Sequence, residues 1–306
     1  MPMSIRFITG RAGTGKSTFI HKEIVQDLID FPLGPPIFML VPDQMTFQTE
    51  YELTNSYGLS GIMRAQVLTF KRLAWFILQE TGGIAKEKVD AVGYRMMLRR
   101  ILEEHKEEFA LFKNAAGKPG FTKEIEKILK EFSQYNVSTQ TVDFLIAQLQ
   151  LQQASPTLLS KMEDLKIVLQ QLEERLGTGF IDGDGFFETL MEKMPYSKSI
   201  QEAHVYLDGY MAFTGQEFEL LKVLIRYAKR ITIVLSVDHL QKDLAESSLF
   251  HRPAKTYEKI LNAVADMNQL SNVRIEFDPT VHLTDVHRFE NDDLRQIECH
   301  FQSPRF

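Results

Sequence analysis

Short apolar segments alternate with amphipathic segments at both ends of this chain. Residues 4–9 carry Ile5, Phe7 and Ile8 and run directly into a glycine, a pattern typical of a buried strand. The next segment, residues 17–29, has apolar side chains at helical spacing, namely Phe19, Ile20, Ile24, Leu28 and Ile29. The start of the chain therefore predicts a strand, a tight loop and a helix.

Four later runs have the composition of further strands. They occupy residues 37–41, 66–70, 205–207 and 231–235, are rich in β-branched and aromatic residues, and end in polar or turn-forming clusters. Because helical patterns separate most of them, we expect an α/β fold with a parallel sheet covered by helices. Ligands bind such sheets at the carboxyl ends of the strands.

The middle of the chain has a different pattern. Between about residues 87 and 176 no run resembles a strand, and amphipathic segments follow one another at 89–104, 123–132, 142–151 and 157–176. The last segment has an apolar seam with steps of four and three residues, formed by Leu158, Met162, Leu165, Leu169, Leu172 and Leu176. At fewer than about three heptads, this seam predicts a helix hairpin within the chain rather than a free coiled coil.

These patterns predict two domains. Glycines at positions 177, 179, 183 and 185 mark a loop in which the chain returns to the sheet. We therefore expect a discontinuous core domain of residues 1–86 and 177–306. An all-helical insertion domain of residues 87–176 interrupts it.

Composition and charge narrow the class of protein. The chain has 306 residues, 44% of them hydrophobic, and a formal net charge of −6, so any polyanion must bind through a local basic surface. The single cysteine, Cys299, excludes an internal disulfide and cannot hold a metal or an iron–sulfur cluster unaided. No apolar run approaches the roughly 18 residues of a membrane span, and residues 1–8 do not resemble a signal peptide. We expect a cytoplasmic protein without a membrane segment.

Residues 10–17 read G-R-A-G-T-G-K-S and satisfy the phosphate-loop pattern in full. In such a loop, glycines let successive N–H groups turn toward the phosphates, and the following helix directs its positive end at the anion. We expect Lys16 to neutralise the β- and γ-phosphates and Ser17 to bind magnesium. The expected ATP-binding residues are Gly10, Ala12, Gly13, Thr14, Gly15, Lys16, Ser17 and Thr18.

A second acidic site follows the strand expected at residues 205–207. Asp208 stands at its tip and is predicted to complete the magnesium site, although an aspartate at a strand end also fits an ordinary turn. Gly209 occupies the position where a glutamate would activate water. Loss of a general base costs about 10² to 10⁴ in rate, so the sequence predicts ATP binding with slow or absent turnover. Glu217 or Glu219 remains as a substitute base.

Several segments together resemble the superfamily 1 DNA helicases. Residues 10–18 are similar to their motif I, residues 41–47 (V-P-D-Q-M-T-F) to motif Ia, and residues 68–74 to a later T-F-x-x-L-A segment. Asp208 resembles part of motif II, and residues 238–241 are faintly similar to motif III. The resemblance implies a single-stranded DNA track along the second and third segments, through Gln44, Thr46, Thr69, Phe70 and Lys71. An ordinary buried helix face after Thr69 explains part of the same pattern.

The combination of V-P-D-Q-M-T-F with L-D-G-Y-x-x-F-T-x-x-E at residues 207–217 resembles the B subunits of AddAB ATP-dependent helicase/deoxyribonucleases. This resemblance implies a RecA-like P-loop core, equivalent to helicase domain 1A, with a 1B-like helical insertion. It also implies DNA, single-stranded or double-stranded, and an A-type helicase/nuclease subunit as partners in a bacterial double-strand-break repair complex. Members of that family are much longer and carry a nuclease domain and four iron–sulfur cysteines. This chain lacks both, so we expect an amino-terminal fragment without a nuclease site.

Three functions from different classes stay open at this stage. The first is a nucleotide-binding helicase-like module, the second a small-molecule kinase or stand-alone ATPase, and the third a scaffold with a vestigial phosphate loop. Basic helix faces in the insertion indicate either solvated surface or contacts to duplex DNA or a partner protein, and comprise Arg95, Arg99, Arg100, Lys123, Lys127 and Lys130. Histidines 204, 239, 282 and 287 lack metal-site spacing.

Overall fold

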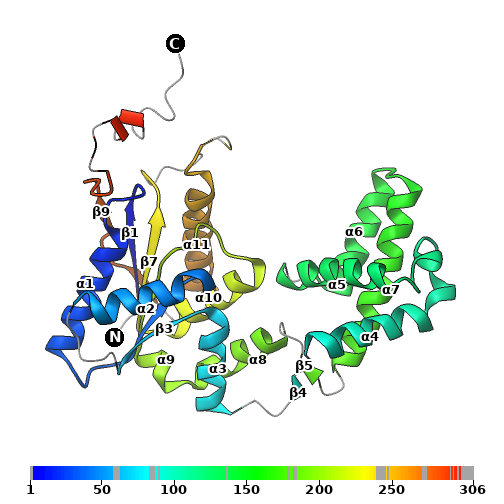
Figure 1. The fold of residues 1–306 in the computed structure, drawn as a ribbon, viewed down its shortest axis with the longest axis horizontal. Coiled ribbons are helices and arrows are strands. Elements are labelled where there is room, and N and C mark those ends of the chain that lie inside the picture. Colours follow the sequence, from blue (N-terminus) through cyan, green and yellow to red (C-terminus); the bar gives the residue numbers. More distant parts are fainter. Residues whose placement is uncertain are drawn as a thin grey trace. The chain divides into compact units, whose positions relative to one another are not determined.

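The computed structural model describes two compact units of the chain (Figure 1). One unit comprises residues 1–81, 193–213 and 217–306, and the other residues 82–192 with 214–216. Within them the structure describes residues 3–57, 63–82, 87–88, 90–135, 137–177, 180–181, 185–238, 246, 248–270, 274–289, 291, 293–294 and 296–297. Of the positions considered above, Gly179, Gly183, residues 239–241 of the segment similar to motif III (His239 among them) and Cys299 lie outside the described residues.

The first unit is built on a seven-stranded sheet in the order β3-β2-β6-β7-β1-β8, with β9 also pairing with β1. Its strands are β1 Met3–Gly10, β2 Ile37–Leu40, β3 Ala65–Leu68, β6 His204–Leu207, β7 Arg230–Ser236, β8 Ile275–Phe277 and β9 Val281–Leu283. All of their pairings are parallel. The predicted α/β fold with a parallel sheet is confirmed.

Helical crossovers join these strands, as parallel pairing requires. They are α1 Lys16–Asp30, α2 Thr46–Asn55 after the short η1 Asp43–Met45, α3 Phe70–Thr81, α10 Gly215–Tyr227 and α11 His251–Leu270. Alternation of side chains along the strands gives the sheet two apolar faces. Ile8 of β1 and Met39 of β2 pack in one cluster with Ile20 and Ile24 of α1.

The opposite face of the sheet carries α3 and α11. Phe7 of β1 meets Tyr257 of α11 edge to face at 4.7 Å between ring centroids, and Phe38 of β2 meets Phe76 of α3 at 5.1 Å. Because the strands run in parallel, their carboxyl ends share one edge of the sheet. The loop after β1 and the turn after β6 therefore lie at that same edge.

The second unit has its own helical core. Its long helices are α4 Ala91–Glu104, α5 Pro119–Gln134, α6 Thr139–Leu151 and α7 Pro156–Gly177, with η2 Lys106–Glu108 and η3 Phe112–Asn114 between the first two. The buried carboxylate of Asp164 in α7 accepts hydrogen bonds from the backbone N–H groups of Ala110, Leu111 and Phe112 at 2.8 to 2.9 Å. This carboxylate fixes the loop between α4 and α5 on the helix bundle.

Two short strands and three short helices complete the described elements. Strands β4 Glu87–Lys88 and β5 Phe180–Ile181 pair in parallel in the second unit. Helix α8 Gly185–Lys193, η4 Met194–Tyr196 and α9 Lys198–Glu202 lead back to β6. No helix in the described part of the chain is long and apolar enough to cross a membrane.

The structure corrects the expected strand at residues 66–70. Strand β3 ends at Leu68 and helix α3 begins at Phe70. The Thr69 hydroxyl accepts a hydrogen bond from the Arg72 backbone N–H at 3.3 Å. A threonine side chain that caps the first turn in this way starts a helix, and Phe70 therefore belongs to the helix rather than the strand.

Candidate nucleotide site

The loop between β1 and α1 has the backbone shape of an anion cradle. Gly13 and Gly15 adopt left-handed conformations, with φ of +87° and +79°. A side chain at Gly13 would also meet the Arg288 Cβ at 2.6 Å, so both the backbone and the space require glycine there. Helix α1 starts at Lys16, and its first N–H groups lack partners within the helix. The loop therefore presents backbone donors where a phosphate chain can bind.

Lys16 places a buried ammonium group within this loop. Its Nζ donates hydrogen bonds to the backbone oxygens of Gly10 at 2.9 Å and Arg11 at 2.7 Å, and the residue is only 7% exposed. Burial lowers the pKa of Lys16, the carboxylate of Asp208 acts against this shift, and the guanidinium of Arg288 adds to it. Two backbone oxygens of the loop therefore hold the Lys16 ammonium group, which the sequence predicts to neutralise the phosphates.

Ser17 and Asp208 meet although their elements are far apart in sequence. The Ser17 hydroxyl donates to Asp208 Oδ2 at 2.6 Å, and the Gly209 backbone N–H donates to Asp208 Oδ1 at 2.8 Å. Asp208 is 5% exposed at the carboxyl end of β6. The two predicted magnesium ligands are therefore in direct contact.

The donor set fits magnesium bound together with a nucleotide. No group of three or more histidine, cysteine, aspartate or glutamate side chains that could hold a metal occurs among the described residues. Magnesium prefers oxygen ligands and keeps water or phosphate oxygens in most of its coordination positions. One hydroxyl and one carboxylate suit a cation that a triphosphate brings with it.

Gly209 closes the position in which a general base is expected. Its φ is +83°, and a Cβ there would overlap the sulfur of Met45 and approach Pro42 Cδ at 3.0 Å. Met45 ends the short helix η1 that follows β2. A glutamate at position 209 would have to adopt a strained backbone conformation and also displace Met45.

The two substitute bases considered from the sequence lie on α10. Glu219 forms an ion pair with Lys222 at 2.6 Å one turn further along the same helix. Burial raises the pKa of the Tyr210 hydroxyl above its usual value, and the nearby carboxylate of Glu217 adds to this shift. Glu219 is thus paired with a lysine of its own helix, and Glu217 lies near Tyr210.

The remaining predicted loop residues have different surroundings. Thr14 is buried, and its hydroxyl donates to the Arg11 backbone oxygen at 3.0 Å, which stabilises the turn of the loop. Ala12 and Thr18 are exposed. Thr14 is therefore a support of the loop, and Ala12 lies at its surface.

Residues 282–288 add a wall to the site that the sequence did not predict. Strand β9 pairs with Ile8–Gly10 of β1, and the His287 backbone N–H donates to the Gly13 oxygen at 2.9 Å. Arg288 follows and brings a second cation beside the loop. The sequence held one weak signal for this wall. Apolar and polar residues alternate at 281–283 (V-H-L), and Val286 and His287 follow just before Arg288.

The residues predicted to contact DNA differ in exposure. Gln44 and Lys71 are exposed, and the Thr46 hydroxyl at the solvent-facing start of α2 donates to the Asp43 backbone oxygen at 2.9 Å. Thr69 is 7% exposed and caps α3. Phe70 is 3% exposed and packs against Tyr210 and Phe213, so in this structure its ring has no open face for a base.

An exposed aromatic pair lies beside these positions. Phe47 is 78% and Tyr51 is 57% exposed, and their rings stack with centroids 6.3 Å apart on successive turns of α2. From the sequence, Phe47 stood out only as the last residue of the 41–47 segment. Helical spacing of four residues between two aromatics was the signal that would have found the pair.

Comparison with known proteins decides the family. A family model described as "ADDB, N-terminal" matches residues 7–298. The chain belongs to this family. It is 47% identical over 299 residues to the B subunit of the ATP-dependent helicase/deoxyribonuclease from Lysinibacillus sphaericus, covering 98% of this chain and 25% of that protein.

Other relatives in this family carry the same description. The corresponding B subunit from Bacillus cereus strain B4264 is 36% identical over 306 residues, covering 98% of this chain and 26% of the relative, and that from Bacillus anthracis gives the same values. The chain thus spans about a quarter of the length of the relatives it matches. The predicted resemblance to helicase/deoxyribonuclease B subunits is confirmed.

Proposed function

We propose that this chain is the nucleotide-binding, helicase-like module of the B subunit of a DNA-repair helicase/deoxyribonuclease, and that it binds Mg·ATP with little or no hydrolysis. The Ser17–Asp208 hydrogen bond carries the proposal, because it joins the two magnesium ligands at the loop that holds Lys16. The family supports it, since relatives are named as subunits of an ATP-dependent helicase/deoxyribonuclease.

The chain's own groups divide the binding work. Backbone N–H groups of residues 13–17 and the start of α1 bind phosphate oxygens, with Lys16 exchanging its two carbonyl partners for them. Ser17 and Asp208 hold magnesium, which supplies charge neutralisation at the phosphates. Arg288 adds a cation at the wall of the loop.

The same proposal assigns slow turnover to the turn after β6. Gly209 has no side chain to accept a proton from water, and Met45 fills the space beside it. Loss of a positioned base lowers the rate by about 10² to 10⁴. Bound ATP then acts as a ligand that stabilises one conformation of the protein, and its hydrolysis does not drive movement.

The proposal includes DNA and a partner subunit. Exposed Gln44 and Lys71, half-buried Thr46 and the ring of Phe47 provide polar and aromatic groups suited to single-stranded DNA. Aromatic stacking contributes about 1 to 3 kcal/mol per base. The full-length protein works with an A-type helicase/nuclease subunit in the cytoplasm. The single cysteine of this chain, which cannot form an internal disulfide, is consistent with a reducing compartment.

Calorimetry and phosphate release test the proposal together. The folded chain should bind Mg·ATP and release phosphate far more slowly than the order of ten per second typical of enzymes, with or without single-stranded DNA. Absence of heat at millimolar ATP and magnesium would refute nucleotide binding. Rapid turnover that is lost in Lys16→Ala would instead show that another residue replaces the missing base.

A further inference from the structure

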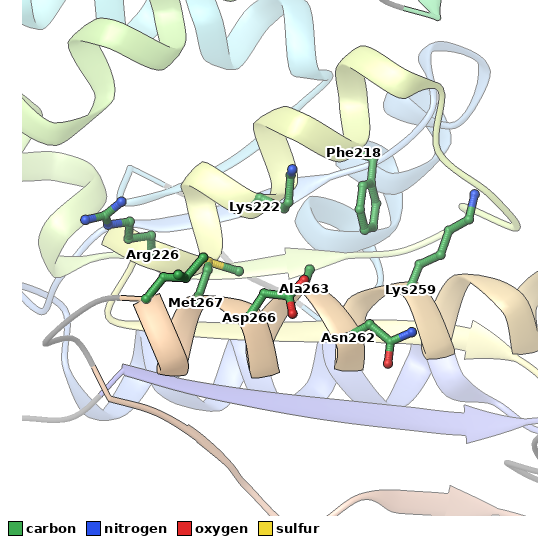
Figure 2. A pocket seen from close by; sticks show the side chains of 9 residues that line it. Phe218, Lys222, Arg226, Lys259, Asn262, Ala263, Asp266 and Met267 are labelled. Carbon is green, nitrogen blue, oxygen red and sulfur yellow. The ribbon is translucent and has the colours of Figure 1, made fainter.

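A groove between α10 and α11 lies on the face of the sheet opposite α1. It has a volume of about 680 Å³ and is lined by Phe218, Lys222 and Arg226 of α10, and by Lys259, Asn262, Ala263, Asp266, Met267 and Leu270 of α11. Figure 2 shows the α10 side chains along one wall and the α11 side chains along the other. The nucleotide site does not use any of these residues.

The two walls are rigidly held. Helix α10 buries Leu220, Leu221, Leu224 and Ile225 on its inner face. Helix α11 is fixed near its start by the Thr256 hydroxyl, which donates to the Met211 oxygen at 3.0 Å, and near its end by Asn268, whose side chain bonds both the N–H and the oxygen of Ile275. The groove is therefore a preformed surface.

The floor of the groove is apolar. Ala263 is a buried small residue that leaves room between the helices, while Phe218 and Met267 are half-buried on either side. Leu270 is 87% exposed at one end. Grooves with an apolar floor between two helices bind the apolar face of a third helix through residues spaced three and four apart.

The rim of the groove is mainly basic. Arg226 and Lys259 lie at opposite ends and Lys222 lies between them on the α10 wall (Figure 2). Lys222 pairs with Glu219, whereas neither Arg226 nor Lys259 forms an ion pair with another described residue. Asp266 is the one acid among the lining residues. Charge complementarity therefore selects an acidic occupant.

We propose that this groove docks an acidic amphipathic helix of a partner protein. The apolar side of that helix covers Phe218, Ala263 and Met267, and its carboxylates meet Arg226 and Lys259 at the two ends. The apolar floor favours a protein over nucleic acid, whose phosphates would leave it unfilled. The inference is independent of ATP binding, since the groove and the phosphate loop use different residues.

Binding of a designed peptide tests this surface. The probe is a fluorescent helical peptide with leucines at positions i, i+3, i+4 and i+7 and glutamates on its flanks; its scrambled and Glu→Lys versions serve as comparisons. We expect only the acidic amphipathic peptide to bind. The double variant Arg226→Glu/Lys259→Glu should weaken its binding about tenfold or more.

A matched variant and a local probe keep the test decisive. Lys22→Glu changes an exposed lysine on α1 and should alter binding less than about twofold. Methyl NMR of methionine should show the Met267 signal shifting with peptide while Met39, buried in the core, stays unchanged. No binding at millimolar peptide, equal binding to the double variant, or displacement of the peptide by a dT20 oligonucleotide would overturn the proposal. Unchanged Mg·ATP binding in the double variant would separate this outcome from a failure of the nucleotide site.

Discussion

The carboxyl ends of β1 and β6 each lead into a left-handed glycine, and the two glycines have different neighbours. Gly13, with φ of +87°, is crowded by Arg288, and Gly209, with φ of +83°, is crowded by Met45. A cation beside the first glycine complements phosphate, whereas a thioether beside the second has no acid–base chemistry at neutral pH. The first set of neighbours supports the proposed phosphate site, and the second supports the proposed lack of a general base.

Backbone strain at an active site is usually explained by the activity that it supports. At Gly209, a left-handed backbone instead accompanies the absence of a catalytic side chain. The same backbone conformation lies against a cation after β1 and against a thioether after β6, and neither glycine has room for a side chain. Position 209 is therefore constrained by its own φ and by Pro42, and the flexible end of the Met45 side chain would have to move aside for a side chain there. We therefore expect that a carboxylate at position 209 would not by itself restore hydrolysis.

Lys16→Ala tests the binding side of the comparison most directly and carries the largest expected effect. Loss of the buried ammonium should weaken Mg·ATP binding about a hundredfold, equivalent to about 3 kcal/mol. Calorimetry provides the measurement, and Lys22→Ala, an exposed lysine on the same helix, provides the control. An affinity within threefold of the parent would contradict the role of Lys16.

Gly209→Glu tests whether the turn after β6 can hold a general base. We expect no gain in phosphate release and a loss of about 1 to 3 kcal/mol in the free energy of unfolding, because the backbone is strained and Met45 is displaced. Chemical denaturation and a phosphate-release assay measure the two effects.

Two companion variants separate the causes. Gly209→Ala reports the backbone strain and the Met45 overlap without the carboxylate. Met45→Ala combined with Gly209→Glu should recover part of the stability, since the overlap with the sulfur is removed. A Gly209→Glu variant that is as stable as the parent and hydrolyses ATP would show that Met45 does not close the position.

The loop after β1 was predictable from the sequence, and the turn after β6 was predictable only in part. The G-x-x-x-x-G-K-[ST] spacing is a local pattern, so it placed Lys16 and Ser17 between a strand and a helix before any tertiary contact was known. Gly209 revealed the missing base. Its overlap with Met45 depends on how η1 meets the end of β6, which no local pattern contains.

Elements with weak local signals were also missed. Strands β8 and β9 have three residues each, and Ile275 is the one residue of the two that is fully buried. Their pairing with β1 comes from a partner strand at the other end of the sequence, and this long-range pairing decides the structure where propensity is weak. As a result, Arg288 was not expected near the loop.

Asp208→Asn tests the residue that links the two loops, because Asp208 accepts hydrogen bonds from both Ser17 and the Gly209 backbone N–H. The amide still accepts the Ser17 hydrogen bond but lacks the charge that magnesium requires. Affinity for ATP with magnesium should fall about tenfold, while affinity in the presence of a chelator should change little. Titrations under both conditions measure the difference, with Asp30→Asn at the exposed end of α1 as the control. Equal loss with and without magnesium would assign Asp208 a purely structural role.

The pH dependence of ATP binding provides the subtlest test. Burial lowers the pKa of Lys16 below its usual value near 10.5, so its charge, and with it the affinity for ATP, should decline as pH rises through that lowered pKa. We therefore expect the affinity to be highest near neutral pH and to fall progressively toward alkaline pH, at a lower pH than an unperturbed lysine would give. Lys16→Arg keeps its charge over this range because a guanidinium titrates above about pH 12, so its affinity profile should be flat even if its absolute affinity is lower. If the affinity of the parent protein were as independent of pH as that of Lys16→Arg, burial would not lower the pKa of Lys16. The ammonium group would then be more hydrated than its two hydrogen bonds to backbone oxygens indicate.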